Sequence, residues 1–252
     1  MRTKIYLDNE EFLTGITLKD SQEAENNNMA LHACLHEKDI VKNREIFASS
    51  LGLSLNHLVC LQQTHSSNFY KVELTDKGRG AHNMATAIQN TDAAYTYEPN
   101  LLLCCFTADC VPLTFYNKTT SLIGVIHSGW QGTVKEITRK VFSYLINYEN
   151  CPPEDFYIYI GRALSQEKFE VDEDVAMQYK ALGYGQEWIT YSSLKKKYLI
   201  DNQQVVIKQC ELTGIPFHQI ITDTTCTLKD KESFSYRQDK SCGRHLSFIM
   251  KK

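Results

Sequence analysis

The stretch Leu101-Leu102-Leu103-Cys104-Cys105-Phe106 runs directly into Thr107-Ala108-Asp109-Cys110, and the fold is organised around this junction. An unbroken apolar run followed by a turn predicts a strand. Successive side chains of a strand point to opposite faces, so Cys104 and Cys105 are expected to face opposite sides and both to lie in the core. The polar residues after the run form a strand end, where binding and catalytic side chains concentrate.

Further apolar runs predict more strands, and apolar residues at helical spacing predict four helices. The strands are expected at 56–62, 67–74, 121–127, 155–160, 217–222 and 246–250. The helices are expected at 39–51, 133–149, 172–182 and 202–213. Thr133 and Glu136 form a T-x-x-E capping box at the start of the second helix. Because strands and helices mix without strict alternation, the fold class is α+β, a mixed α/β fold on mixed β-sheets. Residues 1–252 are expected to form one domain.

The charge balance excludes several classes of partner. Lys and Arg total 27 and Asp and Glu total 30, so the net charge is −3, with no basic excess for nucleic acid or an anionic membrane. No apolar run approaches the roughly 20 residues of a membrane span. The first residues, MRTKIYLDNEEFLTG, lack the apolar core of a secretory signal. The nine cysteines are odd in number and irregularly spaced, which favours reduced thiols and a cytoplasmic location.

Three short segments carry side chains that bind metals or act as nucleophiles. They are Gln63-Thr64-His65-Ser66, Thr107-Ala108-Asp109-Cys110 and His127-Ser128-Gly129-Trp130-Gln131-Gly132. Two imidazoles and one thiolate, from His65, His127 and Cys110, make a three-ligand zinc site with an open fourth position. Their separations of 45 and 17 residues match no compact zinc-finger motif.

Two other interpretations of the same residues stay open. A lone histidine at a strand end is commonly a hydrogen-bonded structural residue, and a free cysteine is commonly a small buried apolar side chain. Alternatively, Cys110 is a nucleophile with His127 or His65 as its base, and Asp109 or Gln63 orients that base or stabilises an oxyanion.

Arg44 stands out on the predicted helix 39–51. At 100° per residue it falls inside the apolar stripe formed by Ile40, Phe47 and Leu51. Its aliphatic stem then packs while its head reaches solvent, or else the guanidinium points inward at an anion.

Taken in order, these motifs resemble those of the laccase-domain or polyphenol oxidase family, whose members are regarded as zinc-dependent purine nucleoside enzymes. The resemblance runs from about residue 40 to the end of the chain. Besides the three segments above, it rests on Asn43-Arg44, Asp92-Ala93, Val111-Pro112, Phe169-Glu170-Val171, Cys226-Thr227, Phe234-Ser235-Tyr236-Arg237 and Gly243-Arg244.

The resemblance implies a fold, a metal and an activity. The fold is a layered α/β/β/α arrangement, and the metal is Zn²⁺, with copper as the second candidate, held by His65, Cys110 and His127. The activity is phosphorolysis of adenosine, inosine, guanosine and methylthioadenosine, together with deamination of adenosine to inosine. The expected partners are purine nucleosides and phosphate, without nucleic acid or membrane, and a homodimer is compatible with the fold.

Roles for the remaining residues follow as hypotheses. For deamination, a zinc-activated water attacks the purine C6 and Asp109 moves protons as a catalytic residue. For phosphorolysis, phosphate attacks C1′ and Arg44 holds it as the second catalytic residue. Gln63, Arg44 and Arg162 are expected to bind substrate.

Two departures from the family pattern bear on the balance of these reactions. Gln131 replaces an arginine, and Arg162 lies in a segment that reads Gly-Pro-Ala-Ile-Gly in the family. Loss of the arginine would favour deamination, unless Arg162 supplies the missing charge.

Three other functions compete with this one. They are a metal-free cysteine hydrolase, a copper-binding polyphenol oxidase and a purine-binding protein without activity. A multicopper oxidase needs several His-x-His pairs, and none of the eight histidines forms one.

Overall fold

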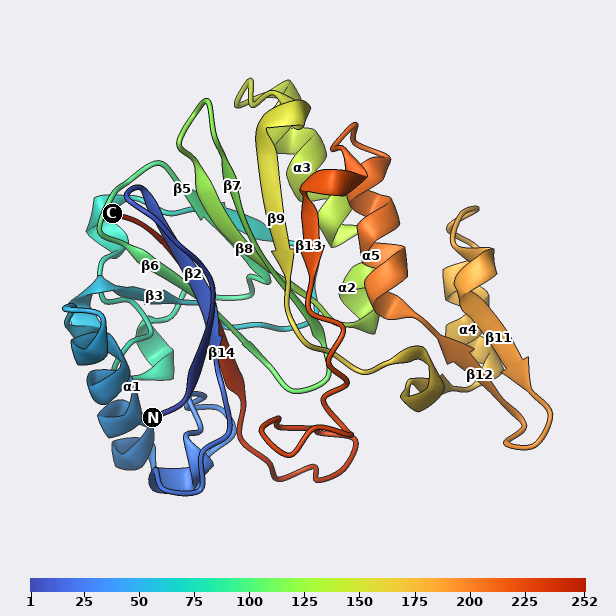
Figure 1. The fold of residues 1–252 in the computed structure, drawn as a ribbon, viewed down its shortest axis with the longest axis horizontal. Coiled ribbons are helices and arrows are strands. Elements are labelled where there is room, and N and C mark those ends of the chain that lie inside the picture. Colours follow the sequence, from blue (N-terminus) through green and yellow to red (C-terminus); the bar gives the residue numbers. More distant parts are fainter.

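The computed structural model describes residues 1–252 and contains two mixed β-sheets that lie face to face (Figure 1). In the first sheet, β3 pairs parallel to β6, and the other neighbours are antiparallel. Its strand order is β1 (Thr3–Asp8), β2 (Phe12–Thr17), β14 (His245–Lys251), β6 (Leu102–Thr107) and β3 (Leu58–Cys60).

The second sheet has six strands and carries parallel pairs only at its two edges, β13 with β9 and β4 with β5. Its strand order is β13 (Ile220–Thr222), β9 (Phe156–Ile160), β7 (Val111–Asn117), β8 (Ile123–Ser128), β5 (Ala93–Thr96) and β4 (Phe69–Lys71).

Helices cover the outer face of each sheet. α1 (Glu37–Ser50) packs on the first sheet, and α3 (Ile137–Asn147) and α5 (Asn202–Glu211) pack on the second (Figure 1). Apolar side chains of both sheets, including Leu103 and Val125, fill the space between them. The expected α/β/β/α layers are therefore confirmed.

The β6 strand shows why the central apolar run has no polar face. Cys104 joins the core beneath α1, together with Phe47, whereas Cys105 joins the core between the two sheets. Both thiols are fully buried and free. A strand enclosed on both sides needs apolar residues at every position, which is what residues 101–106 supply.

A third, smaller sheet forms an arm at one side of the molecule (Figure 1). It consists of β10 (Glu170–Val171), β12 (Lys197–Ile200) and β11 (Ile189–Ser192), with α4 (Glu173–Lys180) packed against it. Phe169 lies at the base of this arm, immediately before β10.

The predicted helix at 133–149 begins differently from the expectation. A short helix, α2 (Trp130–Val134), precedes α3, and Glu136 between them has a positive φ of 58°. The Glu136 carboxylate accepts hydrogen bonds from Arg139 (2.9 Å) and Tyr184 (2.8 Å), and the Thr133 hydroxyl pairs with Ser128 (2.8 Å). The predicted capping box is therefore wrong, because Ser128, Arg139 and Tyr184 take both of its side chains.

The other predicted helices are confirmed to within two residues at each end. The prediction missed the strands β1, β2, β5, β7, β10, β11 and β12. No helix is long and apolar enough to cross a membrane.

Candidate metal centre

The three expected metal ligands meet at the ends of strands from both sheets. His127 lies on β8, Cys110 immediately precedes β7, and His65 lies in the loop between β3 and β4. Their ligand atoms all fall within 4.8 Å of one another, and the Cys110 Sγ to His65 Nε2 distance is 3.9 Å. The imidazole rings of His65 and His127 are edge to face, with centroids 4.9 Å apart.

These separations fit a metal ion in chemistry and in size. Zinc bonds of roughly 2.0–2.3 Å in a tetrahedron place neighbouring ligand atoms about 3.5 Å apart, close to the separation of Cys110 and His65. Imidazole and thiolate are ligands that suit zinc and copper rather than magnesium or calcium. The cluster therefore fits a transition metal with one coordination position open.

The electrostatics favour the ligand form of the cysteine. Burial alone would raise the pKa of the Cys110 thiol, but the charge and hydrogen bonding of His127 and His65 lower it to about 6. Burial would likewise lower the pKa of His127, yet Cys110 and Asp92 raise it to about 9. A thiolate is thus stabilised at neutral pH, and the thiolate is both the metal ligand and the nucleophile.

Asp92 ties two of the ligands together. Its carboxylate accepts a hydrogen bond of 2.8 Å from His127 Nδ1, which leaves Nε2 of that ring for a metal. It also accepts from the backbone N–H groups of Thr64, His65 and Ser66 and from the Ser66 hydroxyl. The sequence marked Asp92 only as part of a family motif. Its role could not be predicted because its partners His65 and His127 lie 27 and 35 residues away.

Backbone geometry also shapes the centre. His65 has a positive φ of 57°, and its carbonyl accepts a hydrogen bond of 2.8 Å from Lys135. Gly129 lies so close that a Cβ there would stand 2.6 Å from His65 Cδ2 and 3.1 Å from Cys110 Sγ. The turn after β8 therefore needs glycine at this position to leave room for the ligands.

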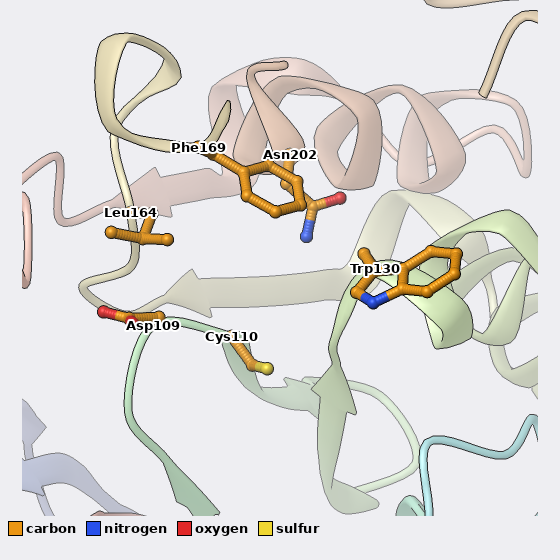
Figure 2. A pocket seen from close by; sticks show the side chains of 6 residues that line it. All are labelled: Asp109, Cys110, Trp130, Leu164, Phe169 and Asn202. Atoms are coloured by element: carbon orange, nitrogen blue, oxygen red, sulfur yellow. The ribbon is translucent and has the colours of Figure 1, made fainter. Parts of the chain in front are cut away.

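Asp109 lies next to Cys110, but its carboxylate is directed away from the sulfur (Figure 2). It accepts hydrogen bonds from the Thr227 hydroxyl (2.6 Å) and from the backbone N–H of Arg237 (2.7 Å). The residue itself has a positive φ of 87°. The geometry favours a role in holding the C-terminal segment against the Cys110 loop over the expected proton transfer.

Gln63 lines the site, yet its amide is occupied. Its Nε2 donates to the Phe106 carbonyl (2.8 Å) and its Oε1 accepts from the Phe106 N–H (2.7 Å). This pair of bonds fixes the loop before His65 to the end of β6.

The structure does not bring Arg44 to the centre. Its guanidinium is completely buried beneath Phe106 and donates to the carbonyls of Met29, Gly80 and Ala81, each at 2.8 Å. Arg44 does point inward from its apolar stripe, but at main-chain oxygens rather than at an anion. The remaining nitrogen, Nη2, is buried without a hydrogen-bond partner. The geometry therefore favours a structural role for Arg44 over the expected binding of phosphate or part in catalysis.

Arg162 is likewise engaged elsewhere. Its Nη1 contacts Asp230 (2.7 Å) and Ser233 (2.9 Å), and its Nε lies 3.7 Å from Asp223. Two carboxylates already balance this buried cation, so the geometry does not support the expected role in substrate binding. Gln131 lies in a separate surface groove.

The metal cluster opens on a cavity of about 360 Å³, large enough for a small-molecule ligand. Several of its residues were not expected as site residues, including Arg244 and Tyr236 from the C-terminal segment. The lining residues are His32, Gln63, His65, Phe106, Thr107, Ala108, Cys110, His127, Tyr236 and Arg244.

A narrower slot of about 50 Å³ lies on the other side of Cys110 (Figure 2). Its walls are mostly apolar and combine residues from four separate segments of the chain. The lining residues are Asp109, Cys110, Trp130, Leu164, Phe169 and Asn202.

Comparison with known proteins identifies the family of the chain. The sequence model of the family described as multi-copper polyphenol oxidoreductase laccase matches residues 17–252. The chain belongs to this laccase family. The family description names several copper ions. The fold, however, contains only one group of three or more metal-binding side chains, His65, Cys110 and His127.

Relatives of this laccase family chain carry a different functional name. The chain is 36% identical over 247 residues to the purine nucleoside phosphorylase YlmD of Bacillus subtilis, covering 96% of this chain and 89% of the relative. It is 32% identical over 224 residues to the purine nucleoside phosphorylase SSP1584 of Staphylococcus saprophyticus, covering 88% and 84%.

Two solved structures share the fold throughout. The Bacillus licheniformis hypothetical protein YfiH superposes with a TM-score of 0.92 at 30% identity, covering 98% of this chain and 99% of that one. YlmD from Geobacillus stearothermophilus superposes with a TM-score of 0.90 at 30% identity, covering 96% and 92%.

Proposed function

We propose that the protein is a zinc-dependent purine nucleoside phosphorylase acting in the cytoplasm on adenosine, inosine, guanosine and methylthioadenosine. The observation that carries the proposal is the His65, Cys110 and His127 cluster, which opens on a cavity of ligand size. The naming of relatives as purine nucleoside phosphorylases supports the same activity.

The metal would be held by the two imidazoles and the thiolate, with Asp92 fixing the ring of His127. When bound, zinc supplies a Lewis acid that polarises an oxygen ligand. Zinc is preferred to copper because phosphorolysis and hydrolysis need no redox change.

Arg244 replaces Arg44 as the proposed phosphate ligand. It lines the cavity beside the metal ligands, and its Nη1 donates to the carbonyls of Cys242 and Gly243. Its Cζ lies 5.4 Å from the centre of the Tyr236 ring. These contacts fix the guanidinium plane, and its other nitrogen atoms remain for an anion.

In the proposed phosphorolysis, different parts of the substrates occupy the cavity and the slot on the two sides of Cys110. Phosphate held by Arg244 attacks C1′ of the nucleoside, the C1′–N9 bond breaks, and the purine leaves with the bonding electrons and takes up a proton. Ribose and phosphate occupy the cavity, and the base is directed toward the apolar slot.

Deamination of adenosine is the second proposed activity of the same centre. The two imidazoles and the thiolate that would hold the metal line the cavity, so a bound metal would supply a Lewis acid for water there. For this reaction adenosine would bind the other way round, with its base in the cavity beside the metal ligands rather than in the slot. Attack of water at C6 with loss of ammonia then gives inosine and needs no phosphate.

The decisive experiment incubates the purified protein with adenosine or inosine, with and without phosphate, and separates the products by chromatography. Free base and ribose 1-phosphate are expected only with phosphate, and inosine from adenosine without it. Arg244→Ala should raise the KM for phosphate at least tenfold, whereas Arg139→Ala, at an exposed cation on α3, should not change it.

The competing functions give different results in the same assay. Activity that persists in protein shown to be metal-free would favour the cysteine hydrolase with Cys110 as nucleophile. Oxidation of phenols by copper-loaded protein without nucleoside turnover would favour the polyphenol oxidase. Nucleoside binding without any product would leave a binding protein.

A further inference from the structure

Asn202 is a buried polar side chain in the wall of the otherwise apolar slot. It is the first residue of α5 and is 6% exposed. Its surroundings fix which way the amide faces. The Ser128 carbonyl only accepts, so the atom 3.3 Å from it is Nδ2, and the Tyr179 hydroxyl donates to Oδ1 at 2.8 Å.

This arrangement leaves one amide hydrogen of Asn202 without a protein acceptor. Figure 2 shows Nδ2 directed into the space between Phe169, Trp130 and Cys110. The carboxylate of Asp109, which also borders the slot, is directed away and already holds Thr227 and Arg237. The Asn202 amide therefore presents a hydrogen-bond donor to the slot, and its acceptor atom is used up by Tyr179.

The shape of the slot limits what meets that donor. At about 50 Å³ it admits the edge of a flat ring, whereas the cavity of about 360 Å³ on the other side of Cys110 has room for ribose and phosphate. Phe169 and Trp130 supply aromatic surface for a planar base.

We propose that the Asn202 side chain donates a hydrogen bond to the 6-position of the purine. It thereby selects 6-oxopurine nucleosides, such as inosine and guanosine, over the 6-amino nucleoside adenosine. This inference rests on the proposed function. The O6 atom of a 6-oxopurine accepts a hydrogen bond from Nδ2, whereas the exocyclic amine of adenosine presents a second donor to it. A donor that faces a donor in a desolvated slot leaves both groups without partners, which is the strongest source of discrimination in such sites.

The experiment compares kcat/KM for the phosphate-dependent release of hypoxanthine from inosine and of adenine from adenosine, using the metal-loaded full chain. Wild type is expected to prefer inosine at least tenfold. Asn202→Leu has a similar shape but no donor, and it should bring the ratio close to one, chiefly by slowing inosine. Gln204→Leu, on the same helix but outside the slot, should leave the ratio as in wild type.

The ratio is the informative readout because general damage to the enzyme lowers both rates together. An unchanged ratio in Asn202→Leu, or a wild type that prefers adenosine, would overturn the inference. If Asn202→Leu does not fold, Tyr179→Phe serves instead, since loss of the anchoring hydroxyl frees the amide to turn and should also reduce the preference.

A binding measurement separates this inference from the proposed function. Hypoxanthine and adenine, the two bases alone, are titrated against the Trp188→Phe variant, so that the tryptophan fluorescence followed is that of Trp130. If hypoxanthine binds more tightly than adenine and Asn202→Leu loses this difference, base selection by the slot is supported. Absence of nucleoside cleavage would then refute only the proposed phosphorylase activity. Equal binding of both bases by the Trp188→Phe variant overturns the slot.

Discussion

Asp92 and His127 are joined by a hydrogen bond of 2.8 Å between Asp92 Oδ1 and His127 Nδ1, in a position where both side chains are buried. The same carboxylate binds the backbone around His65. One residue therefore sets the orientation of one metal ligand and the loop that carries another. Burial alone would raise the pKa of Asp92, but His127 and Ser66 lower it to about 2, so the carboxylate stays ionised.

Asp92→Asn is expected to weaken metal binding by roughly 10- to 100-fold, because the amide is uncharged and satisfies fewer of the donors around it. Competition with a chromophoric chelator measures the affinity. Asp174→Asn, at an exposed position on α4, is the control. Equal affinities in both variants would show that Asp92 does not act on the metal.

Gly129→Ala tests the crowding at the same centre. The added Cβ would stand 2.6 Å from the His65 ring, so the ring must move away from Cys110. Metal content, measured by atomic absorption after dialysis, is expected to fall well below one ion per chain. Gly132→Ala is the matched control, since its Cβ would meet only ordinary contacts at 3.4 Å or more. Full metal content in Gly129→Ala would contradict the crowding.

The sequence predicted the core of the fold and the three side chains that meet in the candidate metal centre, and it did so for physical reasons that are local. The alternation of Cys104 and Cys105 follows from strand geometry alone, and His65, Cys110 and His127 each end or follow a predicted strand. All three residues lie at strand ends, and this location can be predicted without knowing which strands pair with one another.

The unpredicted parts depend on partners distant in sequence. A helical wheel places Arg44 in the apolar stripe, but only the fold shows that the carbonyls of Met29, Gly80 and Ala81 meet it. Asn202 gains its orientation from Ser128, 74 residues away. The strand β1 escaped prediction because half of its residues are exposed and it has no strong apolar pattern. The strand β2 is buried throughout, but Thr14 and Gly15 interrupt its apolar residues.

Arg44→Met is expected to destabilise the protein without affecting the metal centre. Three buried carbonyls would lose their donor, at a cost of about 3 kcal/mol or more, measurable by urea unfolding. Metal content and the KM for phosphate should match wild type. Lys42→Met, on the exposed side of α1, is the control for the added apolar side chain. A large rise in the KM for phosphate would restore Arg44 as a phosphate ligand.

His245 makes the stability of the fold depend on pH. Its Nε2 accepts from the Phe234 N–H (2.8 Å) and its Nδ1 donates to the Thr17 carbonyl (2.7 Å), so the folded protein holds the neutral ring. Burial lowers the pKa of His245 to about 3. In the unfolded chain the pKa is about 6.5.

The sign of the effect follows from proton binding. Between pH 6.5 and pH 3 the unfolded chain binds a proton at this ring and the folded protein does not, so stability is lost as pH falls through this range. The loss from this residue is about 2 kcal/mol between pH 7 and pH 5, at about 1.4 kcal/mol per pH unit below 6.5.

Urea unfolding of wild type and His245→Gln at pH 7 and pH 5 isolates this contribution. The variant is expected to be less stable at pH 7, because glutamine does not reproduce both hydrogen bonds, but to lose about 2 kcal/mol less than wild type on acidification. Other titrating groups, including His127, affect both proteins alike and cancel in the difference. Equal losses in the two proteins would mean that His245 takes up a proton in the folded state as readily as in the unfolded chain.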